Sequence, residues 1–205
     1  CTAHELASLG AHVVLVGRTL DKLQRVQQEI ADDGGRADAY ACDIREEDTV
    51  RQTVQQGVQT CDRIDGLVNN AGGQFPAPME MISTRGFEAV VANNLTGGFL
   101  MAREVFNQSL SKHGGGAIVN MAADMWNGMA GMAHSGAARA GMVNLTKTAA
   151  FEWARSHVRV NAVDPGWVAS SGMDSYGPAM APMILSLKDN LPMRRLGLEA
   201  EISSV

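Results

Sequence analysis

The alternation of apolar strand-like segments with amphipathic helical segments is the feature that most limits how this chain can fold. Residues 12–17 form an apolar segment, as expected for a strand covered on both faces. Leucine, valine and isoleucine then recur at helical spacing over residues 20–30, until Gly34 and Gly35 end the helix. Strands that alternate with helices of this length form parallel sheets, so we predict a doubly wound α/β fold.

The same alternation continues along the chain. Further strands are expected at 37–43, 64–70, 117–121 and 157–163. Helices are expected at 2–9, around 50–58, at 83–112 and at 133–155.

The two ends of the chain do not match a complete sheet of this kind. A doubly wound sheet normally begins with a strand and a glycine-rich phosphate turn, yet the sequence starts within a predicted helix and contains no G-x-G-x-x-G motif. Its last residues resemble the start of a helix. We therefore expect one truncated domain over residues 1–205, without its first strand and glycine-rich turn and without its last strand.

Composition excludes several classes of protein. A formal net charge of −5 without a basic cluster argues against nucleic-acid binding. No apolar run approaches the ~20 residues needed to cross a bilayer. Cys1, Cys42 and Cys61 have neither metal-ligand spacing nor an even number for disulfides, which favours a reducing cytoplasm and predicts no metal site.

Three motifs carry a resemblance to a known family. They are Asn-Asn-Ala-Gly at 69–72, Asn-Leu-Thr-Gly at 94–97 and Arg-Val-Asn-Ala-Val-Asp-Pro-Gly at 159–166. In this order and separation the sequence resembles the short-chain dehydrogenase/reductase family. The resemblance implies a Rossmann-type sheet, a nicotinamide cofactor, oxidoreductase activity and a homo-oligomer, usually a tetramer built on two long helices.

Cofactor contacts are expected where strands end. Small residues after a strand let the backbone approach a flat cofactor, which favours Asn70, Ala71 and Gly72. Asp43 resembles the family's adenine contact, although it could instead cap a helix. The resemblance adds Ile44, Pro165, Gly166 and Val168 to the cofactor-binding residues.

Arg18 bears on the choice between NADP and NAD. An arginine at the end of this strand suits the additional phosphate of NADP, whereas NAD enzymes tend to carry an acid there. We therefore favour NADP(H), with NAD the less favoured cofactor and a solvated surface arginine as the structural alternative.

The catalytic pattern of the family is altered. The family reduces carbonyls with a serine, a tyrosine and a lysine, but the serine position falls here on Ala122 or Ala123. The tyrosine position falls on Ser135 and the lysine position on Arg139. A serine hydroxyl is a poor acid and an arginine keeps its proton, so ordinary carbonyl reduction is not expected.

The stretch His-Ser-Gly-Ala-Ala-Arg-Ala-Gly at 134–141 resembles a narrower branch of the family. It is similar to peroxisomal trans-2-enoyl-CoA reductases and 2,4-dienoyl-CoA reductases, which reduce a C=C bond conjugated to a thioester. Such a reaction needs donors aimed at the thioester oxygen, which the Ser135 hydroxyl and N–H groups at the helix start could supply. The proton for the α-carbon could come from His134, Asp124, Tyr176 or water.

Each of these residues also has a structural interpretation. His134 could be a buried first-turn histidine, and Asp124 could cap a turn. Arg139 is expected to contact the ribose or diphosphate of the cofactor, as the family's lysine position faces it. Asn94 matches a family position that holds a water chain, or it could be a polar group at a helix bend.

Most of the twelve methionines lie between Met121 and Met193, around a loop and a predicted lid at 167–193. Flexible thioethers suit a pocket for an aliphatic acyl-CoA chain, or they could form core or a subunit interface. The main hypothesis is an NADPH-dependent enoyl- or dienoyl-CoA reductase. An alcohol or ketone oxidoreductase with an altered proton donor, and a non-catalytic cofactor-binding protein, are the alternatives.

Overall fold

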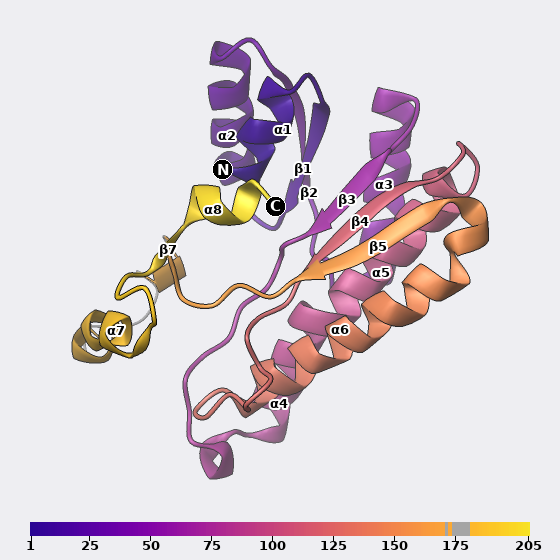
Figure 1. Cartoon of the computed structure of the whole chain (residues 1–205). Coiled ribbons are helices and arrows are strands. Elements are labelled where there is room, and N and C mark those ends of the chain that lie inside the picture. Colours follow the sequence, from indigo (N-terminus) through magenta and orange to yellow (C-terminus); the bar gives the residue numbers. More distant parts are fainter. Residues whose placement is uncertain (171, 174–180) are drawn as a thin grey trace.

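Five long strands form two parallel blocks in this computed structural model, which describes residues 1–170, 172–173 and 181–205 (Figure 1). The first block pairs β1 with β2, and the second block pairs β3, β4 and β5 in that order. All of these pairings are parallel, as predicted. The strand bounds are β1 His12–Gly17, β2 Arg36–Ala41, β3 Gly66–Asn69, β4 Gly116–Met121 and β5 Val158–Val163.

Two shorter strands, β6 (Val168–Ala169) and β7 (Gly197–Leu198), pair with each other near the C-terminus.

Helices occupy the segments between the five long strands, as the periodicity predicts. The α-helices are α1 Thr2–Ser8, α2 Leu20–Asp32, α3 Glu47–Cys61, α4 Thr84–Val91, α5 Gly97–Val105, α6 Ala133–Glu152, α7 Ala181–Leu187 and α8 Glu199–Ser203.

The predicted long helical stretch at 83–112 is confirmed, but two π-helical turns replace parts of its α-helix. They lie at Ala92–Thr96, between α4 and α5, and at Phe106–Leu110, after α5. In the first π turn, the side chain of Asn94 bonds the backbone of a loop that follows β3 rather than solvent. Insertions of this kind are frequent at functional sites.

Helix α3 joins the two strand blocks through the core. Its predicted apolar face is confirmed, since Val50 and Val54 are buried, and they pack in one cluster with residues of α5, β4 and β5. On the same helix, a Cβ placed at Gly57 would lie 3.7 Å from a methyl group of Val14 in β1. Full burial of a valine side chain such as that of Val50 or Val54 stabilises the fold by roughly 1.5–3 kcal/mol.

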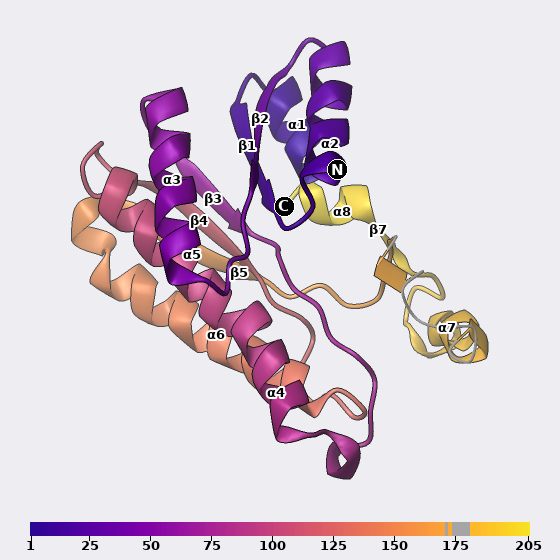
Figure 2. The ribbon, with the colours of Figure 1, turned by 180° about the vertical axis from the view of Figure 1, so that it is seen from behind.

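Figure 2 shows α5 and α6 lying along the β3–β4–β5 block, with α3 beside α5. Near the chain ends, α8 contacts α1, and the thiol of Cys1 donates to a carboxylate oxygen of Glu199 at 3.4 Å. Within the described residues, β1 and β3 do not pair with each other. The predicted lack of a first and a last strand stays a prediction.

Among the described residues, no helix is both long enough and apolar enough to span a bilayer. The predicted lid at 167–193 is only partly described, and it includes α7 and the 3₁₀ turn Lys188–Asn190. The methionines divide between two environments. Met125 and Met142 are buried, whereas Met193 is exposed, so the methionine-rich stretch is part core and part surface.

Candidate functional site

Three loops that follow β3, β4 and β5 meet at the carboxyl edge of the sheet. The parallel register places Asn69 beside Asn120, and Met121 beside Val163, so these strands end together. The loops then bond to one another. The N–H of Ala77 donates to the carbonyl of Gly131 at 2.8 Å, and the N–H of Asp124 donates to the carbonyl of Pro165 at 3.3 Å. Open α/β sheets bind ligands at this edge.

Asn94 holds the loop after β3 against the helical layer. Its side-chain oxygen accepts the N–H of Gly73 at 2.9 Å, and its side-chain nitrogen donates to the carbonyl of Gly73 at 2.8 Å. The same oxygen accepts from the guanidinium of Arg139 at 3.2 Å. Asn94 is therefore a polar group at an irregular turn of the helix, and it holds both Gly73 and the predicted site residue Arg139.

Arg139 is a buried cation whose acceptors are neutral. The side chain is 8% exposed, and its guanidinium donates to the carbonyl of Met121 at 2.5 Å and to Asn94. No carboxylate of the described residues forms an ion pair with it. Burial accordingly lowers the pKa of the guanidinium from its ordinary value, because the charged form loses hydration.

Gly72 gives this guanidinium its space. A Cβ at Gly72 would overlap an Nη atom of Arg139 and would lie 2.7 Å from the side-chain oxygen of Asn94. A residue with any side chain would therefore displace the cation. The small residue predicted here for close approach of a cofactor thus also makes room for the arginine.

His134 and Ser135 are almost wholly enclosed at the start of α6, at 0% and 1% exposed. The ring nitrogen Nδ1 of His134 accepts the N–H of Ser135 at 2.8 Å, so the ring is neutral with its proton on Nε2. Nε2 is buried without a hydrogen-bond partner among the described residues. The ring packs edge to face with Phe75, at 4.5 Å between centroids.

Because of this arrangement, fewer hydrogen-bond donors are available to an oxyanion than the sequence suggested. The N–H of Ser135 is used by His134, and the N–H of Gly136 donates to the carbonyl of Met132 at 3.0 Å. Ser135 and Arg139 lie one helical turn apart and share a face of α6. The Ser135 hydroxyl and the Arg139 guanidinium are the remaining side-chain donors on that face.

The other proton-donor candidates differ in exposure. Asp124 is exposed in the loop after β4, and Ala122, at the family's serine position, is buried. Tyr176 lies outside the described residues. Asp124 is thus the described candidate that is open to solvent.

Arg18 and Asp43 lie where β1 and β2 end. The carboxylate of Asp43 binds the guanidinium and the N–H of Arg45, and this pairing lowers the pKa of Asp43 to about 2, with a smaller contribution from Arg18. The alternative that Asp43 caps α3 is wrong, because Glu46 is the residue at the N-cap. Arg18 is exposed and forms no ion pair with any described residue.

Two further polar groups at this edge were not among the predicted site residues. A carboxylate oxygen of Asp164 is buried without a hydrogen-bond partner among the described residues, directly before Pro165 and Gly166. A buried chain of bonds also crosses the layers, with the Asn69 amide donating to Asn120 at 2.9 Å and the Asn120 amide donating to Thr146 at 2.8 Å. The asparagines within otherwise apolar strands were the feature of the sequence that could have indicated this network.

The residues at this edge fit a nicotinamide dinucleotide. Ala71 and Gly72 leave the backbone exposed after β3, and Arg18 offers an unpaired cation. Ile44, a further predicted contact, is buried and packs its side chain in the core, 2.5 Å from where a Cβ of Gly97 would lie. The predicted contact Val168 lies in β6 and is half-buried.

Comparisons with known proteins agree with this geometry. The family described as short chain dehydrogenase matches residues 1–180. A probable 2,4-dienoyl-CoA reductase of Bacillus subtilis (strain 168) is 31% identical over 99% of this chain and 81% of its own length. A glucose 1-dehydrogenase of Gluconobacter oxydans is 34% identical over 98% of this chain and 76% of its own length.

Solved structures are also similar. A citronellol catabolism dehydrogenase of Pseudomonas aeruginosa PAO1 has a TM-score of 0.88 and 54% identity, and the match covers 100% of this chain and 78% of that one. A short-chain type dehydrogenase/reductase from Mycobacterium marinum has a TM-score of 0.92 and 29% identity, over 99% of this chain and 80% of that one. With its parallel sheet, its motifs and these matches, the chain belongs to the short-chain dehydrogenase/reductase family of oxidoreductases.

Proposed function

We propose that this protein reduces the C=C bond of an enoyl- or dienoyl-CoA thioester and uses NADPH as its reductant. The observation that carries the proposal is Arg139, a buried guanidinium without a carboxylate partner among the described residues, one turn from Ser135. A site of this charge suits a reaction in which negative charge develops on the substrate. Reduction of a conjugated thioester does so, because its oxygen becomes an enolate oxygen.

The side chains have separate roles in this scheme. The Ser135 hydroxyl donates to the thioester oxygen, and the charge of Arg139 stabilises the enolate electrostatically. Asn94 fixes Arg139 and the Gly72–Gly73 backbone in one arrangement through its two bonds to Gly73. Bound NADPH would supply the hydride for the β-carbon.

The proton for the α-carbon comes from Asp124 or from water that it orders. Neutral His134 keeps its proton on Nε2 beneath Phe75 and holds the N–H of Ser135 at Nδ1. A neutral imidazole is a weak acid, so His134 acts by positioning Ser135. To donate as an imidazolium, the ring would have to give up the bond at Nδ1.

NADP(H) is favoured over NAD(H) by Arg18, which is exposed and unpaired where β1 ends. Asp43, the carboxylate that interacts with Arg18 electrostatically, forms its ion pair with Arg45 instead. A free guanidinium binds a phosphate through bidentate hydrogen bonds. In addition to its role in the reaction, Arg139 is proposed to contact the ribose or diphosphate of the cofactor.

The experiment is a spectrophotometric assay of NADPH oxidation with crotonyl-CoA, a 2,4-dienoyl-CoA and a branched enoyl-CoA. The branched substrate enters because a similar structure is named for citronellol catabolism. We expect thioester-dependent loss of NADPH absorbance, and a Ser135→Ala variant should be slower by about 10²–10³-fold. Turnover of all three substrates at the rate of a protein-free blank would contradict the proposal.

A second candidate function is the oxidation of an alcohol. It is supported by the glucose and citronellol catabolism dehydrogenases among the similar proteins. The same assay, run in reverse with NADP⁺ or NAD⁺ and citronellol or glucose, distinguishes the two functions. Tight binding of NADPH without turnover of any substrate would instead support a non-catalytic cofactor-binding protein.

We also propose a homo-oligomer, such as a tetramer, built on the helical layer. The side chain of Phe99 on α5 is 39% exposed, beside a hollow that also includes Leu95 and the α6 residues Gly141 and Leu145. Such an apolar hollow between two helices suits the same surface of a second copy. Light scattering after gel filtration should show loss of oligomer in a Phe99→Glu variant.

A cytoplasmic location for this protein stays a prediction.

A further inference from the structure

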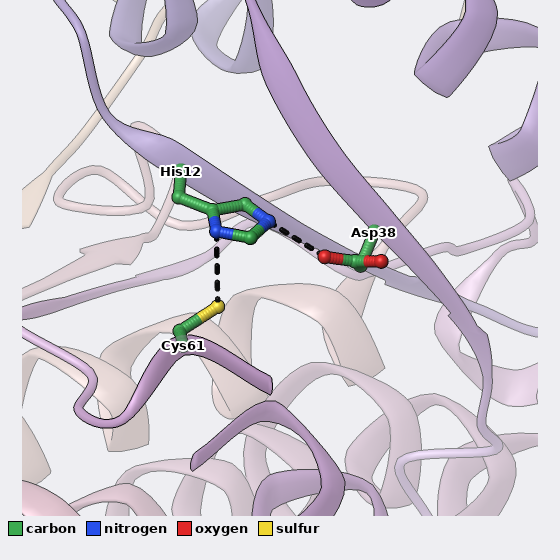
Figure 3. A group of neighbouring side chains, drawn as sticks. All are labelled: His12, Asp38 and Cys61. Atoms are coloured by element: carbon green, nitrogen blue, oxygen red, sulfur yellow. Dashed lines mark hydrogen bonds and ion pairs between the residues drawn. The ribbon is translucent and has the colours of Figure 1, made fainter. Parts of the chain in front are cut away.

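A cluster of three metal-ligating side chains lies away from the carboxyl edge of the sheet. His12 begins β1, Asp38 is in the middle of β2, and Cys61 is the last residue of α3 (Figure 3). In the parallel register, His12 pairs with Arg36 and Val14 pairs with Asp38, so the histidine and the aspartate point to the same face. The end of α3 covers that face and brings the thiol to the ring.

The two ring nitrogens of His12 have different partners. Nε2 lies 2.6 Å from a carboxylate oxygen of Asp38, and Nδ1 lies 3.6 Å from the sulfur of Cys61. One ligand atom from each residue can be chosen so that all three atoms lie within 4.8 Å of one another. Figure 3 shows the ring between the other two side chains.

The distance between sulfur and Nδ1 matches the spacing of two ligands on one zinc ion. Zn–S and Zn–N bonds of about 2.3 and 2.0–2.1 Å at a tetrahedral angle separate the sulfur from the nitrogen by roughly 3.6 Å. The Asp38 oxygen is too close to Nε2 for an ion to lie between them. It instead occupies the place of the carboxylate that commonly orients a metal-binding histidine from the opposite ring nitrogen.

Charge and access agree with a cation site. A coordinating thiolate and Asp38 supply two negative charges, and Arg36 is the nearby positive charge. The side chains of His12 and Asp38 are 25% and 33% exposed, so an ion can reach them without unfolding of the strands.

We propose that Cys61 and His12 bind a thiophilic divalent cation of the zinc type, with Asp38 orienting the imidazole. The cation lies between the sulfur and Nδ1, and water or an incoming ligand completes its coordination. The residues come from β1, β2 and α3, and their wide separation in the sequence is why cysteine spacing predicted no metal site.

The test is titration of the purified, reduced protein with Co²⁺, followed by displacement with Zn²⁺. We expect a thiolate-to-cobalt absorption band that Zn²⁺ abolishes, and loss of that band in Cys61→Ser and in His12→Gln. Asp38→Asn should weaken zinc affinity by about 10–100-fold without abolishing it. Arg36→Gln should tighten it, because a neighbouring positive charge is removed.

Cys1→Ser is the matched control, since Cys1 is an exposed thiol outside the cluster. It should bind Co²⁺ and Zn²⁺ as the unchanged protein does. A second measurement needs no variant: Zn²⁺ should slow alkylation of Cys61, followed by peptide mass spectrometry, at least tenfold more than it slows alkylation of Cys1. Equal Co²⁺ binding by the protein and its Cys61→Ser variant, or slowing of both thiols by zinc to the same extent, would overturn the proposal.

Discussion

Replacement of Arg139 by methionine should separate stability from activity. The guanidinium makes two hydrogen bonds, to Met121 and Asn94, and hydrogen bonds to charged groups are worth about 1.5–3 kcal/mol each. Against this, a cation that is 8% exposed loses several kcal/mol of hydration, and no carboxylate of the described residues offsets the loss. The lowered pKa of the guanidinium has the same cause.

The two contributions nearly cancel, so Arg139→Met should change the free energy of unfolding by no more than about 1–2 kcal/mol in either direction. Turnover of the enoyl thioester should nevertheless fall by about 10²–10³-fold, the usual effect of removing one preorganised donor or charge. Chemical denaturation measures the first quantity, and single-turnover oxidation of NADPH measures the second.

Arg155→Met is the matched control, because Arg155 is exposed in the 3₁₀ turn after α6. It should alter neither measurement. If Arg139→Met instead destabilised the fold by more than about 3 kcal/mol, and activity fell only in proportion to the folded fraction, the guanidinium would be a structural group. The assignment of its charge to the reaction would then be refuted.

Three further results are expected. Arg18→Ala should raise the dissociation constant of NADPH by tenfold or more in calorimetry and leave that of NADH within about twofold, because one phosphate contact is lost; equal changes would remove the NADP assignment. The pKa of Asp43 is about 2, below its value in the unfolded chain, so its pairing stabilises the fold above about pH 4 and that stability is lost as the pH falls toward 2. Asp43→Asn should thus unfold more easily at pH 5, by roughly 1 kcal/mol after solvent screening, and match the unchanged protein near pH 2; a constant difference would contradict this reasoning. Gly72→Ala should lower the melting temperature, because its Cβ would crowd the Asn94 side chain at 2.7 Å, whereas Gly166→Ala, with no atom within 4 Å, should not.

The strands and the apolar helix faces could be predicted from the sequence because they depend on local periodicity. β1 lies at His12–Gly17 as predicted, and Val50 and Val54 of α3 are buried. The meeting of the strand-end residues at one edge also follows from parallel pairing alone. These features need only the pattern of each segment and a rule about sheets.

The environment of individual site residues could not be predicted in this way. Whether His134 is free or enclosed depends on Phe75, which reaches it from a loop far away in the sequence. The use of the Ser135 N–H by the histidine ring depends on a side-chain rotamer rather than on the helix start. Periodicity contains no information on either contact.

Asn94 shows how one long-range contact can decide the interpretation of a motif. The Asn-Leu-Thr-Gly sequence is compatible with a regular helix, and its local pattern predicts one. The loop after β3 presents both an N–H and a carbonyl of Gly73 to the Asn94 amide, and the helix has a π turn at this residue. The same amide oxygen then holds Arg139 at 3.2 Å, so the irregular turn, the glycine loop and the buried cation form one unit. A substitution that shortens Asn94 should therefore disturb Arg139 and Gly73 together, and its effects on turnover should not add to those of Arg139→Met.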